Sequence, residues 1–151
     1  MRPMYLLITL GLAGSGLACS DHEFHPPDRE EQVAAADSLF SPAMFDTIRW
    51  ESDSARVFVG NETYAAECRR CHGFLGRADT DYAEAQGLEV PSLVEEDWRF
   101  AGDIDGLRRI IFTGHPRGMP TWGVAGISPR EIDAVAFYIL VQLRPDALGE
   151  S

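Results

Sequence analysis

The chain has 151 residues, 45% of them hydrophobic, and a formal net charge of −11 at pH 7. This length corresponds to roughly one domain of about 100–150 residues, and the hydrophobic content is sufficient for a packed core. The negative charge argues against broad binding to nucleic acid, which requires a basic surface. The three cysteines are an odd number, so a framework of disulfides alone would leave one of them unpaired.

Residues 1–18 have the features of a secretory signal peptide, namely one basic residue, a short apolar run and small residues before Cys19. The apolar run is shorter than the ~20 residues needed to cross a bilayer. The sequence Gly16-Leu17-Ala18-Cys19 resembles a bacterial lipobox, in which the cysteine is diacylated and becomes the new N-terminus. Ordinary cleavage near this point, which would leave Cys19 free or remove it, is the alternative. In both cases we expect an exported protein at the periplasmic or extracytoplasmic face of a bacterial membrane, where an acylated Cys19 would anchor it.

Residues 19–47 are interpreted as a tether that joins this anchor to a domain covering residues 48–151. The tether begins with acidic residues and prolines and has little hydrophobic content at first. Within it, Asp28 followed three residues later by Glu31 has the pattern of a helix N-terminus. This pattern predicts a short helix that ends near Phe40.

Three longer helices are predicted inside the domain, over residues 54–67, 103–112 and 128–143. The last is the clearest, because its apolar residues recur at helical spacing behind a capping box. The residues that begin or end these helices are Asp103, Gly114, Ser128 and Pro145. Since no segment shows the convincing alternation of a β-strand, the sequence predicts an all-α fold.

The sequence Cys68-Arg69-Arg70-Cys71-His72 carries the chemistry, because C-x-x-C-H is the attachment motif of c-type haem. Two residues between the cysteines on a helical turn match the separation of the two haem vinyl groups, to which the thiols add. The following residue, His72, then lies beneath the iron as its proximal ligand. We therefore expect one covalently attached haem c, with its iron, held by Cys68, Cys71 and His72.

Two other uses of this motif fit the sequence less well. A thioredoxin-like redox dithiol belongs in a βαβ context, which the sequence lacks. A structural zinc site needs four ligands, usually in two close pairs. His22 and His25 would be the second pair, but they fall in the tether.

The sixth ligand is expected from the loop of residues 114–123, where glycines and prolines exclude a helix or a strand. This loop carries Met119, and a methionine displayed on such a loop is well placed to reach iron. His115 is the rival ligand and would give bis-histidine coordination. Met44, the other methionine of the mature chain, better fits the usual role of core filler. A thioether ligand favours ferrous iron and raises the potential relative to bis-histidine coordination.

With these motifs in place, residues 60–143 resemble a bacterial monohaem class I cytochrome c. The matching residues are Gly60, Tyr64, Cys68, Cys71, His72, Met119, Pro120, Val135 and Tyr138. The resemblance implies the cytochrome c fold, with three to five helices around one haem. It also implies that Gly60 and Tyr64 of the first helix meet Val135 and Tyr138 of the last.

The resemblance further implies roles for residues around the haem. Pro91 falls in the family's Pro-x-Leu segment, where the proline carbonyl accepts a hydrogen bond from the proximal imidazole and fixes its orientation. The candidate partners for the haem propionates are Trp98, Trp122, Arg56, Arg108 and Arg109.

The charged residues are unevenly distributed, and all 13 basic residues are arginines. Members of the family that dock through a ring of lysines therefore have no counterpart here. Acidic residues gather in two segments, 20–53 and 77–105, each with nine acidic and two basic residues. We hypothesise that Arg69, Arg70 and Arg117 partly surround the exposed haem edge. A scattered, solvated set of arginines is the alternative.

The function implied by these features is one-electron transfer, without catalysis by the chain itself. Iron with both axial positions filled leaves no site for a substrate. The expected partners are redox proteins and, through the lipid anchor, a membrane, but not nucleic acid. A haem c subunit or domain of a membrane-associated oxidoreductase complex, such as a dehydrogenase or terminal oxidase, is the alternative. A haem enzyme or ligand sensor would require the bond from Met119 to be labile.

Overall fold

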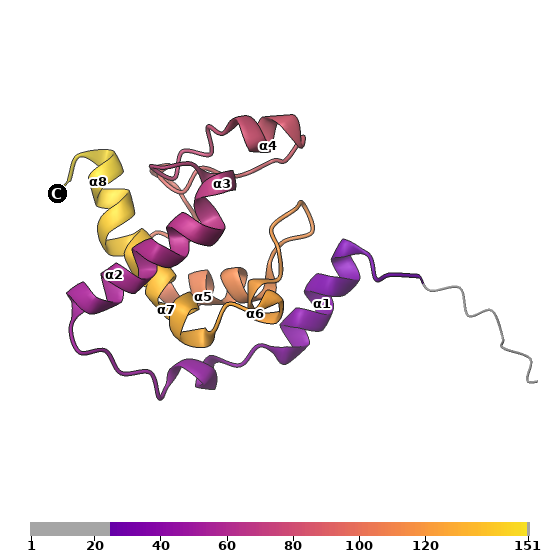
Figure 1. The fold of residues 1–151 in the computed structure, drawn as a ribbon, viewed down its shortest axis with the longest axis horizontal. Helices are drawn as coiled ribbons and strands as arrows, with labels where there is room; N and C mark the ends of the chain where they lie inside the picture. The colour runs from indigo at the N-terminus through magenta and orange to yellow at the C-terminus, as the bar shows by residue number, and fades with distance from the viewer. Residues whose placement is uncertain (1–24, 151) are drawn as a thin grey trace, which may run out of the picture.

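The structure, a computed structural model, describes residues 25–150 (Figure 1). In this part of the chain helices are joined by loops, and no strand is formed beyond an isolated bridge between His115 and Met119. The all-α prediction is confirmed. The elements in chain order are α1 (Arg29–Leu39), the 3₁₀ turn η1 (Pro42–Phe45), α2 (Asp53–Thr63), the π turn η2 (Tyr64–Cys68), α3 (Arg69–His72), α4 (Asp81–Ala85), α5 (Ile104–Thr113), α6 (Trp122–Ala125), α7 (Pro129–Tyr138), the π turn η3 (Ile139–Leu143) and α8 (Arg144–Leu148).

Two of these runs are long, continuous helices interrupted by a π turn. In the first, α2 begins behind Ser52, whose hydroxyl accepts a hydrogen bond from the Ala55 backbone N–H at 3.1 Å. It continues through η2 into α3, so the helix predicted over 54–67 is part of a longer run that ends at His72. In the second, α7 continues through η3 into α8. Single π turns inside helices are frequent at functional sites, and η2 ends on Cys68 of the C-x-x-C-H sequence.

The two long helices cross at Gly60 (Figure 1). A Cβ atom at this position would collide with the Ala134 carbonyl oxygen and with Cβ of Tyr138, so the close approach requires glycine. One turn further along, the ring centroids of Tyr64 and Tyr138 are 5.8 Å apart. The predicted contact between the first and last helices is confirmed. Val135 is fully buried in the adjoining core.

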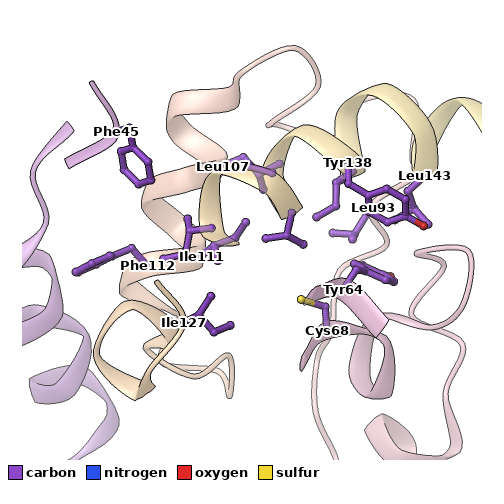
Figure 2. Close-up of a cluster of buried hydrophobic side chains, with 14 of the residues drawn as sticks. Phe45, Tyr64, Cys68, Leu93, Leu107, Ile111, Phe112, Ile127, Tyr138 and Leu143 are labelled. Carbon is purple, nitrogen blue, oxygen red and sulfur yellow. The ribbon is translucent and has the colours of Figure 1, made fainter. Parts of the chain in front are cut away.

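The hydrophobic core lies between these crossed helices and α5 (Figure 2). Leu107 and Ile111 of α5 are buried and face the last helix (Figure 2). The ends of α5 follow the sequence prediction: the Asp103 side chain accepts from the Gly106 backbone N–H at 2.8 Å, and Gly114 ends the helix with φ 72°. Because α5 is anchored in the core, the loop that follows Gly114 starts from a fixed point.

The end predicted for the last helix, at Pro145, is wrong. The helix runs on through α8 to Leu148 and stops at Gly149, which adopts a left-handed conformation with φ 74°. Pro145 lies in the first turn of α8, directly after η3. The altered hydrogen-bond spacing of that π turn accommodates a residue that has no backbone N–H.

The segment before α2 packs against the rest of the molecule. The helix predicted behind Asp28 forms as α1, and its capping box with Glu31 is present. Asp37 of α1 forms a salt bridge with Arg109 of α5 at 2.8 Å, and the Phe40 ring meets Phe112 edge-on at 5.5 Å between centroids. Residues 29–47 of the segment interpreted as a tether are thus held on the domain, because their apolar side chains join its core. The predicted signal peptide and Cys19 lie outside the described residues.

None of the helices described here is long and apolar enough to cross a bilayer.

Candidate haem site

A cavity of about 700 Å³ collects the residues that the sequence assigns to the haem. Its walls come from η2 and α3, from α4, from residues 88–100 and from the loop between α5 and α6. The predicted site residues that line it are Cys68, Cys71, His72, Pro91 and Met119. His115, the rival sixth ligand, lines it as well. The fold thus brings together every haem-holding residue named from the sequence.

The two cysteines stand one helical turn apart where η2 passes into α3. Both are free thiols, Cys68 buried and Cys71 partly buried. Burial raises the pKa of the Cys68 thiol to about 12, and the Glu67 carboxylate adds to this rise. Without haem, Cys68 is therefore a neutral thiol at physiological pH. Redox dithiols instead depend on a cysteine of depressed pKa, which argues against the thioredoxin-like alternative.

His72 is the last residue of α3 and its backbone is fixed from both sides. Its carbonyl accepts from the Ala78 N–H at 2.9 Å, and the next residue, Gly73, accepts a 2.8 Å hydrogen bond from the Tyr64 hydroxyl. Burial lowers the pKa of the His72 imidazole, and its interaction with the accepting backbone carbonyl of Pro91 partly opposes this effect. The ring is therefore held neutral, the form in which histidine binds metals.

The Met119 loop, residues 114–121, is a tight turn. The His115 N–H donates to the Met119 carbonyl at 3.0 Å, and the Gly118 N–H donates back to the His115 carbonyl at 3.1 Å. A Cβ at Gly114 would strike the backbone of Met119 and Pro120, so this turn also requires a glycine. The His115 ring also stabilises this turn, because its Nδ1 accepts a hydrogen bond from the Arg117 backbone N–H at 3.2 Å. One nitrogen of the rival ligand is thus engaged within the loop itself. The loop is shorter than the predicted 114–123, since α6 begins at Trp122.

Three of the arginines proposed as propionate partners lie elsewhere. Arg56 and Arg108 both pair with the buried carboxylate of Asp133, and Arg109 pairs with Asp37. None of the three lines the cavity. The two tryptophans named with them do line it, and the arginines in its wall are Arg29, Arg70, Arg99 and Arg117. These four, together with Trp98 and Trp122, replace the original candidate set.

Of the three arginines hypothesised to surround the haem edge, two line the cavity and one does not. Arg70 lines the cavity and stacks over the Tyr82 ring, 3.8 Å from its centroid. Arg117 lines the cavity and reaches Glu89 at 3.4 Å. Arg69 does not line it. Arg29 was missed by sequence reasoning because it was placed in the tether, whereas α1 brings its guanidinium to the Gly118 carbonyl at 3.4 Å.

The residues around the cavity fit a haem group. The volume lies within the range of cofactor sites, roughly 300–1,000 Å³. The lining offers two thiols at C-x-x-C spacing, an imidazole, a thioether and guanidinium groups suited to carboxylates. Nδ1 of His72 is buried without a hydrogen bond of normal geometry among the described residues, although the Pro91 backbone lies close enough to affect the pKa of the ring. Within residues 25–150 no three His, Cys, Asp or Glu side chains gather into a metal site of the zinc type.

This all-α fold, with a C-x-x-C-H cavity closed by a methionine loop, defines a class I c-type cytochrome domain. The family model described as "Cytochrome C oxidase, cbb3-type, subunit III" matches residues 55–139, and the chain belongs to this family.

Three proteins similar to this chain are named as subunits of cbb3-type cytochrome c oxidases. The "Cbb3-type cytochrome c oxidase subunit CcoP" of Rhodobacter capsulatus is 29% identical over 68% of this chain and 37% of its own length. The protein of the same name from Rubrivivax gelatinosus is 29% identical over 58% of this chain and 26% of its own. The "Cbb3-type cytochrome c oxidase subunit FixP" of Azorhizobium caulinodans is 32% identical over 58% and 27%. The chain thus spans about a quarter to a third of the length of these relatives. No solved structure matches it significantly.

Membership of this family establishes the cofactor and the kind of chemistry. The chain carries covalently attached haem c with its iron, and it serves electron transfer. The relatives are subunits of an oxidase complex by name.

Proposed function

We propose that the chain is a one-electron carrier in which four residues hold the haem. Cys68 and Cys71 would attach it through two thioether bonds, and His72 and Met119 would bind its iron. The observation that carries this assignment is the cavity itself, which collects the two thiols, the imidazole and the thioether from η2, α3 and the Met119 loop. Haem c supplies an iron that cycles between the ferrous and ferric states.

The chain's own residues set the conditions for this cycle. Burial keeps the His72 imidazole neutral, so that it offers a lone pair rather than a proton. Pro91 orients that ring through its backbone. The Met119 thioether stabilises the reduced state relative to a second imidazole. Trp98 and Trp122 in the cavity wall exclude water, which limits the reorganisation that accompanies a change of charge.

The same assignment argues that the chain is not an enzyme by itself. With His72 and Met119 both bound to the iron, no position would be left at which a substrate could bind it. The pairing of His115 Nδ1 with the Arg117 N–H favours Met119 over His115 as the sixth ligand, since His115 already stabilises the turn that displays the methionine.

For partner and place, we propose that the chain exchanges electrons with a terminal oxidase at the extracytoplasmic face of a bacterial membrane. The support is its family and the oxidase subunits among its relatives. A lipid at Cys19 would anchor it there, with residues 1–18 removed after export and the haem domain following the anchor. The chain acts either as a mobile carrier or as a subunit of the complex. Purification in native lipid separates the two, because a subunit stays with the oxidase and a carrier does not.

The ligand assignment is tested with Met119→Ala in the holoprotein, alongside His115→Ala as the matched control. We expect Met119→Ala to lose the absorption band of the methionine–iron bond, to bind carbon monoxide rapidly and to lower the reduction potential. His115→Ala should keep the band and bind carbon monoxide no faster than the wild type. If instead His115→Ala opens the iron and Met119→Ala does not, the assignment is reversed.

A further inference from the structure

A second cavity lies beside the haem cavity, between α2 and α6. It measures about 490 Å³, and we call it the α2–α6 pocket. The residues that form it are Phe58, Val59, Glu62, Thr63, Ala66 and Glu67 from the α2 side and Trp122, Ala125, Gly126, Ile127 and Glu131 from the α6 side.

The α2–α6 pocket carries apolar surface that the fold leaves in water. Phe58 in its lining is 66% exposed, and Val124, next to Ala125 of the lining, is 56% exposed. Gly60, two residues after Phe58, is buried against the last helix, so α2 turns one side to the core and this aromatic ring outward. An exposed apolar patch with a polar rim marks an interaction surface more often than a random surface does.

The charge of the pocket specifies the chemistry of what it binds. Its charged lining residues are all glutamates, namely Glu62, Glu67 and Glu131. Arg29, Arg70, Arg99 and Arg117 line the haem cavity, where acidic residues accompany them, and none of the four lines the α2–α6 pocket. A complementary surface therefore has apolar residues at its centre and lysine or arginine at its rim.

The pocket shares part of its wall with the haem cavity. Ala66, Glu67 and Trp122 line both. A protein seated in the pocket is thus separated from the haem cavity by a single layer of side chains. Electron tunnelling falls steeply with distance, so this is a favourable place for a redox partner to dock.

We propose that the α2–α6 pocket is the docking site of a one-electron redox protein whose contact face is apolar at its centre and basic at its rim. The proposal rests on the electron-transfer function proposed above and adds the face and the partner's chemistry. In the step itself one electron moves between the two proteins, so that one is oxidised as the other is reduced, and no bond is formed or broken.

The test measures the second-order rate of electron exchange between the holoprotein and a lysine-rich mitochondrial cytochrome c at low and high ionic strength. The variants are Glu62→Lys and Phe58→Ala. Each has a matched control that makes the same change outside both cavities. These are Glu84→Lys, on exposed α4, and Phe74→Ala, which removes an aromatic ring that is 73% exposed.

At low ionic strength we expect Glu62→Lys to slow exchange about tenfold, with the difference disappearing at high salt, because electrostatic steering is screened. Phe58→Ala should slow exchange by roughly fivefold at both salt concentrations, as loss of an interface aromatic does. The two control variants should remain within about twofold of the wild type. Equal slowing by Glu62→Lys and Glu84→Lys would mean that only net charge matters, and the docking site would be rejected.

Two further measurements separate this inference from its premises. A reversible one-electron titration with a haem c spectrum establishes the proposed function in every variant; its failure would remove that function and not only the docking site. Sedimentation of the wild type and of Phe58→Ala reports self-association. A dimer that Phe58→Ala dissociates would assign the pocket to a second copy of the chain and overturn the proposal.

Discussion

Asp133 is a charged residue inside the apolar stripe of α7, and its carboxylate joins three parts of the molecule. It accepts from Trp50 Nε1 at 2.6 Å and from Arg56 of α2 at 2.5 Å, and it pairs with Arg108 of α5. The aspartate is almost fully buried, and the two guanidinium groups are mostly so. Breaking a buried pair from one side is costly, because the remaining charges lose their partner.

We therefore expect Asp133→Asn to lower the free energy of unfolding by about 3–4 kcal/mol, the lower part of the range for buried pairs, because the arginines keep some contact with water. Asp105→Asn is the matched control, since Asp105 binds the same Arg108 at 2.6 Å with a side chain that is 80% exposed. Its cost should stay below about 1 kcal/mol. Urea unfolding of the two holoproteins measures both values, and equal losses would show that burial of Asp133 contributes nothing.

Asp133 also shows that the ion-pair partner of an arginine could not be predicted from the sequence. Arg56 and Arg108 were candidates for the haem propionates, but the preference of a guanidinium for a carboxylate does not say which carboxylate. Asp133 is 77 and 25 residues away from them in sequence. The C-x-x-C-H residues needed no such knowledge, because their spacing on one helical turn is local. Met119 was proposed because the glycines and prolines around it exclude regular structure.

At the scale of elements, caps predicted helix starts well. Asp28, Asp103 and Ser128 each cap the predicted helix through a side-chain oxygen. The short elements η1, α4, α6 and α8 were missed, since four or five residues give no measurable periodicity. The π turns were missed because five residues inside a longer helical pattern do not change its periodicity measurably.

The capping box of α7 gives a prediction about pH. Ser128 holds the Glu131 carboxylate through its hydroxyl at 2.6 Å and its N–H at 2.9 Å, which lowers the pKa of Glu131 below its ordinary value. A carboxylate whose folded-state pKa is depressed stabilises the fold above its unfolded pKa, near 4.3, and this contribution is lost as the pH falls through the lower folded-state value.

Glu131→Gln should therefore cost less than about 1 kcal/mol at pH 7, and the difference from the wild type should shrink as the pH falls below about 4. Urea unfolding from pH 3 to pH 7 measures this difference. In a Ser128→Ala background the hydroxyl is gone, and the pH dependence of the same substitution should be smaller. A difference that grows toward acid pH would contradict the assignment.

At the scale of the whole molecule, the distribution of charged residues in space differs from their distribution along the sequence. The acidic segments 20–53 and 77–105 suggested a haem site between two negative regions. In the structure the wall of the haem cavity holds four arginines together with Glu67, Glu89, Glu95 and Asp97, whereas the charged residues of the α2–α6 pocket beside it are all glutamates. Arg29 reaches that wall from the far N-terminal helix, which no local pattern could indicate.

The packing of α1 leads to a prediction about where the domain begins. Ala36 is 1% exposed, and Phe40 and Phe45 pack against the core formed by later helices. If the domain began at residue 48, deleting residues 1–47 behind a cleavable export signal would leave its stability unchanged. We expect that deletion to lower the free energy of unfolding by roughly 3–5 kcal/mol, the value of burying two aromatic side chains and a small one.

Deletion of residues 1–24 should cost less than about 0.5 kcal/mol, since Asp28 and the helix it caps remain. Phe40→Ala in the intact chain should give part of the larger loss even if the longer deletion fails to fold. Equal stability of the two deletions in urea would place the domain boundary at residue 48 and leave α1 as an appendage.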